Sequence, residues 1–231
     1  MKKTIFSLYI FTFIFFLFSS CKQDNDNFNF FIEFYNNKIE AFRLENEEYK
    51  HKMVDAIFLG DSLTEGYNLQ EFYPEYIVLN RGISGDTSIG LEKRLDVSLF
   101  AIQPKVAVML IGANNMDTML ENYENILKSF EEKLSNTKII LLSLTSMGRE
   151  WGKKNQLAAY NNVQIKMYAE KYGYEYVDLY SPLLNLEDGE IYDDYTTDGG
   201  HLTKKGYEVL TNCIKPVLQN NIEVWQNENI L

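Results

Sequence analysis

The sequence predicts an α/β protein with a three-layer α/β/α architecture, in which a parallel sheet is covered by helices on both faces. Two observations lead to this prediction: short apolar runs that end in glycine or a polar turn, and longer amphipathic segments that alternate with them. Strands that are apolar throughout are typical of a sheet buried on both faces. No internal repeat or low-complexity linker separates these segments, so we expect one domain.

The strands are assigned from their short apolar or aromatic runs. The predicted strands are Val54–Gly60, Tyr76–Leu79, Val106–Ile111, Ile139–Leu144 and Tyr174–Leu179. Glycine ends the first strand, and Asn80-Arg81-Gly82 is read as the stop signal of the second. Gly112 follows the third strand in the same way.

The helices are assigned from apolar residues at helical spacing among charged ones. The predicted helices are Phe30–Tyr49, Asp86–Phe100, Tyr123–Leu134, Asn155–Tyr172 and Thr203–Leu218. Thr203 is a candidate N-cap of the last helix, because threonine side chains accept hydrogen bonds from the first turn. Pro216 is expected near the end of that helix, because proline interrupts helical hydrogen bonding.

The amino end predicts a signal peptide of the lipoprotein type over residues 1–20. Lysines precede an uncharged apolar stretch at 5–18, which has signal-peptide length and is short for a transmembrane helix. Two serines then precede Cys21, which resembles the lipobox of bacterial lipoproteins. On this interpretation Cys21 is lipidated, residues 21–29 form a flexible tether, and residues 30–231 form the domain with its N-terminal amphipathic helix. A plain secretory peptide with an incidental cysteine is the alternative.

The composition excludes several classes of partner and site. The formal net charge of −11 argues against nucleic acid or an anionic membrane surface, since both require a basic face. The chain has only two cysteines and two histidines, too few for a structural zinc site of clustered Cys and His ligands. With Cys21 lipidated, Cys213 has no disulfide partner, and we expect a buried thiol near the last helix.

Chemically informative residues follow the predicted strands. The segments are Gly60–Gly66 (GDSLTEG), Asn80–Thr87 (NRGISGDT), Gly112–Asn115 (GANN) and Thr197–Leu202 (TDGGHL). In open parallel sheets, ligands bind beyond the carboxyl ends of the strands. One serine, two glycine-rich turns, one asparagine and an Asp-x-x-His therefore meet at one edge. This set indicates a nucleophile, oxyanion donors and a base with an orienting carboxylate.

These four blocks, in this order, resemble the SGNH (GDSL) hydrolase family. The resemblance covers residues 54–218, nearly the whole predicted domain. It implies a flavodoxin-like fold with a five-stranded parallel sheet, and a carboxylic ester hydrolase that needs no cofactor or metal. A Gly-Asp-Ser-Leu string alone would more often mark a turn, so the combination carries the assignment.

The resemblance also implies a role for each matching residue. Ser62 is the expected nucleophile, His201 the base that takes its proton, and Asp198 the residue that orients the imidazole. The oxyanion hole is expected to consist of the backbone N–H groups of Ser62 and Gly85 and the side-chain amide of Asn114.

Other residues near these blocks are expected to have roles outside the catalytic set. Asp61 is expected to bond the turn and not to act in catalysis. Asn115 stands where the family frequently has aspartate, so a charge is lost at that position. Arg149 and Trp151, in the loop Met147–Lys154, are candidates for lining the substrate, and a plain surface loop is the equal alternative.

The leading function is a serine ester hydrolase that acts through an acyl-enzyme, with a short acyl group such as acetyl on a carbohydrate. A lysophospholipase, lipase or thioesterase is the enzymatic alternative, and a catalytically silent glycan-binding lipoprotein is the alternative from another class. The expected partner is a small-molecule or glycan ester. The expected location is outside the cytoplasm, facing the periplasm or cell surface, with membrane attachment only through the lipid on Cys21.

Overall fold

The computed structural model describes residues 29–229 of the chain. The chain divides into two units, Met1–Ala41 and Phe42–Leu231. A helix runs from residue 29 to residue 49, close to the predicted range. The predicted signal peptide, the lipidation site Cys21 and nearly all of the tether lie outside the described residues. Within residues 29–229, every helix is too short or too polar to cross a bilayer.

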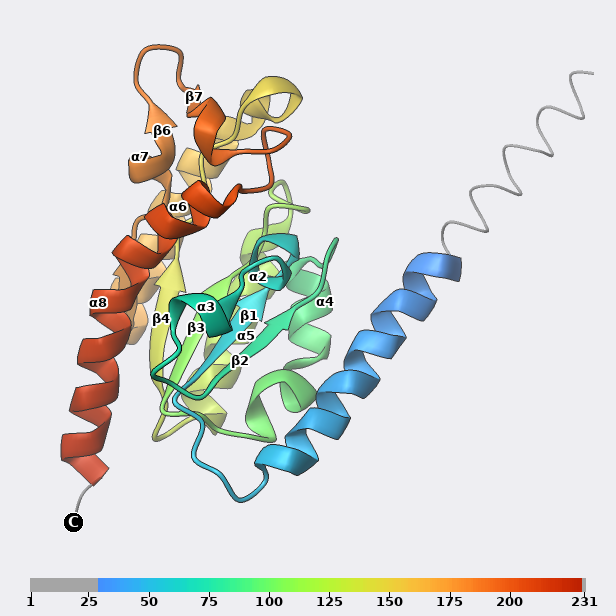
Figure 1. Ribbon diagram of the computed structural model, residues 1–231, viewed down its shortest axis with the longest axis vertical. Coiled ribbons are helices and arrows are strands. Elements are labelled where there is room, and N and C mark those ends of the chain that lie inside the picture. The colour runs from blue at the N-terminus through green and yellow to red at the C-terminus, as the bar shows by residue number, and fades with distance from the viewer. Residues whose placement is uncertain (1–28, 230–231) are drawn as a thin grey trace, which may run out of the picture. The chain divides into compact units, whose positions relative to one another are not determined.

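A five-stranded parallel sheet forms the centre of the second unit (Figure 1). Its strands are β1 (Ala56–Gly60), β2 (Val78–Gly82), β3 (Val106–Leu110), β4 (Lys138–Leu142) and β5 (Glu175–Val177). They are hydrogen-bonded in the order β2-β1-β3-β4-β5, which is the flavodoxin-like order that the resemblance implies. Gly60 pairs with Gly82 on one side and with Leu110 on the other, so three strands end at the same level.

Helices cover both faces of this sheet, as predicted for a three-layer α/β/α fold (Figure 1). One face packs against α4 (Ser88–Lys93), α5 (Met119–Lys133) and α6 (Asn155–Tyr172). The other packs against α2 (Ser62–Glu65), α3 (Leu69–Phe72), α7 (Tyr180–Leu183) and α8 (Lys204–Asn229). Along β1, Ile57 and Leu59 enter the first core, while Ala56 and Phe58 enter the second. Period-two alternation thus divides an entirely apolar strand between two cores.

The predicted bounds of one strand and one helix within residues 76–100 are wrong. The strand predicted at Tyr76–Leu79 is β2, so the supposed stop at Asn80-Arg81-Gly82 lies inside the strand. Asn80 is tolerated there because its amide donates to the carbonyl oxygens of Thr64 and Tyr67. The helix predicted over Asp86–Phe100 is also divided. It consists of α4 and a separate π-helical segment, Asp96–Phe100.

The last helix is longer than predicted. Thr203 caps it, as expected, since its hydroxyl accepts a hydrogen bond from the Gly206 N–H group at 3.2 Å. Pro216 lies inside α8 and not near its end. Proline removes one helical hydrogen bond, but Leu218 and Ile222 beyond it are buried in the second core, and this packing holds the helix together. Cys213 on α8 is half-buried and not fully buried.

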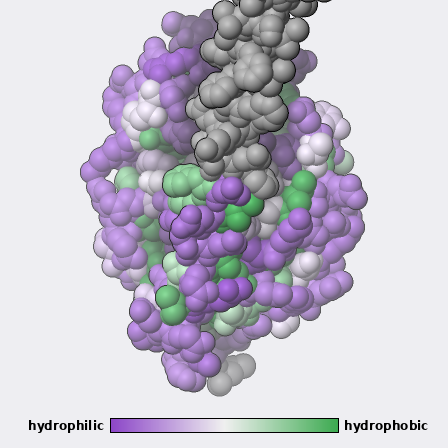
Figure 2. All heavy atoms as spheres, turned by 90° about the vertical axis from the view of Figure 1, so that its right-hand side faces the viewer, coloured by the Kyte–Doolittle hydropathy of each residue, from purple (hydrophilic) through white to green (hydrophobic). Residues whose placement is uncertain are grey.

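The remaining differences are short elements and shifted ends. Helix α5 begins four residues earlier than Tyr123, at Met119, and β5 is shorter than predicted at both ends. A hairpin of β6 (Leu184–Asn185) and β7 (Glu190–Ile191) was not predicted. On the face that Figure 2 shows, hydrophilic residues predominate and hydrophobic residues occur in small scattered groups.

Candidate active site

Ser62 lies directly beyond the end of β1, as the first residue of α2. The preceding Asp61 caps this short helix, since its Oδ1 accepts a hydrogen bond from the Leu63 N–H group at 3.1 Å. Gly60 is required for the close approach of the neighbouring chain segments. A Cβ at this position would collide with the side chain of Thr64 and the carbonyl oxygen of Leu110. The turn therefore holds the Ser62 hydroxyl at the edge of the sheet.

His201 and Asp198 reach Ser62 from a loop far along the chain. The His201 Nε2 atom lies 3.0 Å from the Ser62 Oγ atom. The other ring nitrogen, Nδ1, lies 2.7 Å from the Asp198 Oδ2 atom. The three predicted residues thus form one continuous hydrogen-bonded chain. In such a chain, the imidazole can take the hydroxyl proton while the carboxylate stabilises the imidazolium that forms.

The Asp198 carboxylate is fixed by several donors. Its Oδ1 accepts hydrogen bonds from the backbone N–H groups of His201 at 2.7 Å and Gly200 at 2.9 Å. These contacts, led by those from His201, hold the pKa of Asp198 well below its ordinary value. The carboxylate is therefore ionised near neutral pH, the state in which a carboxylate can orient an imidazole.

Gly199 lets this loop fold tightly. Its φ angle is +94°, in the left-handed region that favours glycine. The Gly199 N–H group donates to the Thr196 hydroxyl at 2.8 Å, and the Gly148 N–H group donates to the Gly199 carbonyl oxygen at 2.8 Å. A Cβ at position 199 would collide with the Gly148 carbonyl oxygen.

Two of the three predicted oxyanion donors, Gly85 and Asn114, lie on the turns after β2 and β3. Gly85 has a φ angle of +79°, which explains the need for glycine there. The Asn114 side-chain amide donates one hydrogen bond to the Asp86 carbonyl oxygen at 2.8 Å, which leaves its second N–H for another acceptor. Asn114 lines the same cavity as Ser62. Asn115 turns away to α4, where it bonds both the N–H group and the hydroxyl of Ser88.

A cavity of about 60 Å³ lies beside the Ser62 hydroxyl. Residues that follow β1, β3 and β4 line it, together with one loop and the His201 segment. They are Asp61, Ser62, Leu63, Ala113, Asn114, Thr145, Met147, Trp151, Gly200 and His201. Thr145 was missed as a lining residue, and Met147 was named only as the first residue of the loop Met147–Lys154. The principle that ligands bind beyond the carboxyl ends of parallel strands could have identified them, because they follow β4 just as Asn114 follows β3.

Of the two loop residues singled out in the sequence, Trp151 borders this cavity and Arg149 does not. Arg149 adopts a φ angle of +54°, and its backbone N–H group donates to the Glu190 carboxylate at 2.7 Å. Its guanidinium donates to the Thr197 carbonyl oxygen at 2.7 Å. Arg149 therefore joins the Trp151 loop to the segment that carries Asp198 and His201.

Asp61 places a buried carboxyl directly before the candidate nucleophile. Burial raises the pKa of Asp61 to about 7, and the neighbouring Asp86 carboxylate adds to the rise. Its Oδ2 atom has no hydrogen-bond partner among the described residues. The turn-bonding role expected for this residue fits its contact with the Leu63 N–H group.

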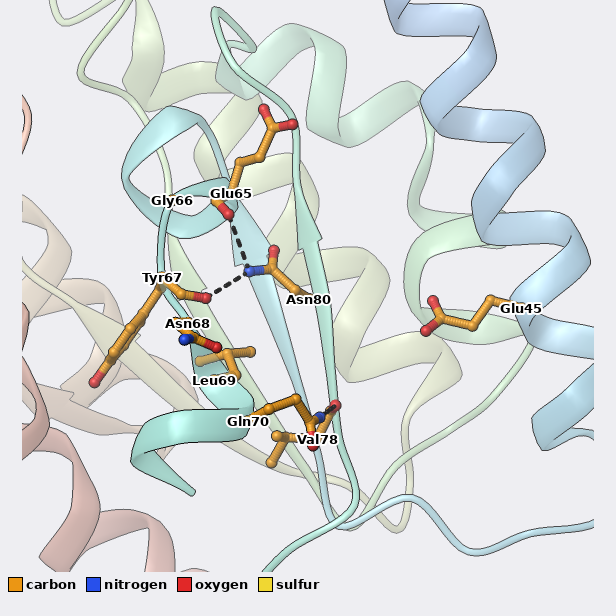
Figure 3. Close-up of a pocket in the computed structure, with 9 residues that line it drawn as sticks. All are labelled: Glu45, Glu65, Gly66, Tyr67, Asn68, Leu69, Gln70, Val78 and Asn80. Atoms are coloured by element: carbon orange, nitrogen blue, oxygen red, sulfur yellow. Dashed lines mark hydrogen bonds between the residues drawn. The ribbon is translucent and has the colours of Figure 1, made fainter. Parts of the chain in front are cut away.

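A larger cavity, about 440 Å³, lies between the segment that follows α2 and strand β2 (Figure 3). Its lining includes Glu45, Glu65 and Asn80, and the Asn80 amide is held by the carbonyl oxygens of Glu65 and Tyr67. It contains no hydroxyl–imidazole pair, so the chemistry is assigned to the smaller cavity. Within residues 29–229, no three His, Cys, Asp or Glu side chains are grouped in a way that could hold a metal ion.

Solved structures with similar folds were found for most of the chain. A protein from Streptococcus pneumonia, provisionally described as a platelet activating factor, is 26% identical with a TM-score of 0.70, over 86% of this chain and 99% of its own. A GDSL-like lipase from Bacteroides thetaiotaomicron is 23% identical with a TM-score of 0.68, over 79% of this chain and 97% of its own. A catalytic mutant of an acetylxylan esterase from Geobacillus stearothermophilus is 18% identical with a TM-score of 0.59, over 71% and 93%.

The last two similarities show the fold alone, because the identities are low. No curated protein matches the sequence. The model of the GDSL-like lipase/acylhydrolase family matches residues 58–209, which is most of the chain and includes Ser62, Asn114, Asp198 and His201. The fold, the order of the sequence blocks and this match agree, and the chain belongs to the GDSL-like lipase/acylhydrolase family.

Proposed function

We propose that this protein is a serine ester hydrolase that acts through an acyl-enzyme on short-chain esters, in particular acetyl esters of carbohydrates. The observation that carries the proposal is the hydrogen-bonded chain from Ser62 through His201 to Asp198. Family membership supports an ester hydrolase of this type.

In the proposed acylation step, His201 takes the Ser62 hydroxyl proton as the oxygen attacks the ester carbonyl carbon. The carbonyl oxygen becomes an oxyanion, which accepts hydrogen bonds from the N–H groups of Ser62 and Gly85 and from the free N–H of the Asn114 amide. The C–O bond to the alcohol then breaks, and the leaving oxygen takes the proton from His201. Asp198 stays ionised throughout and stabilises the imidazolium.

The second step returns the enzyme to its starting state. His201 takes a proton from a water molecule, and the resulting oxygen attacks the acyl carbon. The bond to the Ser62 Oγ atom breaks, that oxygen recovers the proton, and the carboxylic acid leaves. Each step uses the same donors, so one arrangement serves both halves of the reaction.

The size of the cavity supports a short acyl group. A volume of about 60 Å³ beside the Ser62 hydroxyl is enough for an acetyl group. The Trp151 and Met147 side chains are among the residues that line it. We take the small volume as support for acetyl over the lysophospholipase and thioesterase alternatives. The acetylxylan esterase among the structural neighbours also supports this choice.

The location is proposed from the sequence. The residues that precede the described range predict export and lipidation of Cys21. A tethered enzyme outside the cytoplasm encounters polysaccharides, which is why we propose glycan esters as substrates.

The test is hydrolysis of p-nitrophenyl acetate by the chain and by its Ser62→Ala variant. We expect turnover by the parent, no turnover above background by the variant, and falling rates as the acyl chain grows from C2 to C10. Rates that rise toward C10 would favour the lipase alternative. Absence of turnover and of fluorophosphonate labelling on Ser62, with glycan binding retained in Ser62→Ala, would favour a silent glycan-binding protein.

A further inference from the structure

Arg94 places a buried guanidinium group behind the candidate active site. It follows α4, and only 3% of its side chain is exposed. Its Nε atom donates to the Asp86 Oδ2 atom at 2.7 Å, and its Nη2 atom donates to the Gly60 carbonyl oxygen at 2.9 Å. Its Nη1 atom donates to the Arg81 carbonyl oxygen at 2.9 Å and to the Ser98 hydroxyl at 2.8 Å. One side chain thus contacts three backbone segments near the sheet edge.

Two of these contacts, those with Gly60 and Asp86, lie next to proposed oxyanion donors. Gly60 is two residues before Ser62, whose N–H group is the first donor. Asp86 directly follows Gly85, whose N–H group is the second. The Asp86 carbonyl oxygen accepts the hydrogen bond that holds the Asn114 amide, the third donor, at 2.8 Å. The three donors follow three different strands. Arg94 bonds Gly60 and Asp86, which lie within two positions of Ser62 and Gly85, and the Asp86 carbonyl oxygen holds the Asn114 amide.

The contacts need an arginine. A guanidinium group carries five N–H donors in one rigid plane, whereas an ammonium group has three donors around one atom. Here the donors reach acceptors on the ends of β1 and β2 and on the turn after β2 simultaneously. The Asp86 carboxylate balances the buried charge, and Gly90 leaves space for it, because a Cβ there would collide with the Asp86 carboxylate.

We propose that Arg94 is a positioning residue for the oxyanion hole, which sets the spacing of the Ser62, Gly85 and Asn114 donors through Gly60 and Asp86. This inference rests on the proposed esterase function. Oxyanion contacts are stronger in the transition state than in the bound ester, so a displaced donor set lowers kcat and leaves KM nearly unchanged. A purely structural role would instead lower the fraction of folded protein without changing kcat per active site.

Arg81 offers a matched control. It is a second arginine at the end of β2, with a fully buried side chain. Its guanidinium pairs with Glu45 and Asn46 and lies over the Phe42 ring at 4.7 Å. It therefore ties residues 42–49 to the sheet and reaches none of the turns that carry the oxyanion donors. Arg81→Met removes a comparable buried charge and retains the backbone carbonyl that Arg94 uses.

The experiment compares the full chain with Arg94→Met, Arg94→Lys, Asp86→Asn and Arg81→Met. Circular dichroism establishes folding, and fluorophosphonate titration counts active sites. Kinetics with p-nitrophenyl acetate and inhibition by an alkylboronic acid, which forms a tetrahedral adduct on serine, follow at a temperature at which each variant is folded. Where Arg94→Met does not fold, Arg94→Lys supplies the comparison, since it keeps the charge and most of the volume.

We expect Arg94→Met to lose about 10²–10³-fold in kcat per titrated site, comparable to the removal of one oxyanion donor, with KM within about threefold of the parent. Boronate affinity should fall together with kcat. Arg94→Lys and Asp86→Asn should lie between Arg94→Met and the parent, and Arg81→Met should keep kcat within about threefold.

Two results would overturn the inference. One is an Arg94→Met or Arg94→Lys variant that retains parental kcat per titrated site. The other is an equal loss of kcat in Arg81→Met, which would assign the effect to general loosening of the sheet edge. Either result leaves the esterase proposal intact if the parent is active and Ser62→Ala is not. An inactive parent refutes both proposals together.

Discussion

The buried carboxyl of Asp61 makes a quantitative prediction about stability and pH. The perturbation is Asp61→Asn. It keeps one oxygen to accept the hydrogen bond from the Leu63 N–H group and replaces the other with an NH₂ group, so the side chain no longer titrates. Only 1% of Asp61 is exposed, and burial raises its pKa to about 7 from an ordinary value of 3.8. Protonation of this one side chain is therefore coupled to folding.

The direction in which stability changes with pH follows from the protons bound in the folded and unfolded states. Between pH 4 and 7 the folded protein holds the Asp61 proton and the unfolded chain has released it, so a rise in pH opposes folding. The loss of stability that Asp61 causes is absent below its pKa in the unfolded chain. It grows between the two pKa values and is constant above the pKa in the folded protein. A pKa that rises from 3.8 to about 7 corresponds to about 4 kcal/mol at full extent, since each pH unit contributes about 1.4 kcal/mol.

The assay is urea denaturation of the parent and Asp61→Asn at several pH values from 4.5 to 8. The free energy of unfolding of the variant, minus that of the parent, should increase by about 1.4 kcal/mol per pH unit up to pH 7 and then level off. Burial of the unpaired amide adds a constant cost, so the slope with pH is the measured quantity.

Asp96→Asn is the control, because 88% of the Asp96 side chain is exposed. Its stability difference from the parent should change little over the same pH range. A difference for Asp61→Asn that stays constant from pH 4.5 to 7.5 would refute the reasoning. It would mean that Asp61 is ionised in the folded protein in spite of its burial.

Three further predictions concern the loop residues and the cavity. Asp198→Asn should lower kcat about 10⁴-fold, because a neutral amide does not stabilise the imidazolium and its NH₂ group can hold the imidazole in the wrong tautomer; a loss below tenfold in p-nitrophenyl acetate hydrolysis by the folded variant would contradict this. Trp151→Ala should raise the kcat/KM for p-nitrophenyl hexanoate relative to acetate about tenfold, since it opens the cavity beside Ser62; an unchanged ratio would show that Trp151 does not limit acyl length. Gly199→Ala should lower Tm more than Gly173→Ala. Both glycines have positive φ angles, which cost about 1–2 kcal/mol with a side chain, but only a Cβ at position 199 would collide with a backbone oxygen; equal losses of Tm in thermal denaturation would count against this.

Much of the sheet and of the candidate site could be predicted from the sequence, because the patterns that indicate them lie within short stretches of the chain. The apolar runs of β1, β3 and β4 and the glycines that follow β1 and β3 are visible in the sequence, and parallel strands bring their carboxyl ends to one edge. This geometry is why Ser62 and Asn114 could be expected to lie close together.

Errors occurred where long-range contacts outweigh local preference. Asn80 and Arg81 look like a turn, yet they belong to β2, because the Asn80 amide satisfies carbonyl groups of the chain after Ser62 and Arg81 binds Glu45 and Asn46. Pro216 looks like a helix end, yet α8 continues past it, because burial of apolar residues farther along outweighs one lost hydrogen bond.

The sequence by itself determined the fold class, the family and the candidate residues, because strand patterns and glycine turns are properties of neighbouring residues. Only the tertiary structure decided that His201 lies 3.0 Å from a serine 139 positions earlier in the chain. It also decided that Trp151 borders the cavity while Arg149 does not, and that Arg94 joins the ends of β1 and β2 to the turn after β2. Those facts depend on distances between segments remote in sequence, which are fixed when the whole chain packs and which no local pattern records.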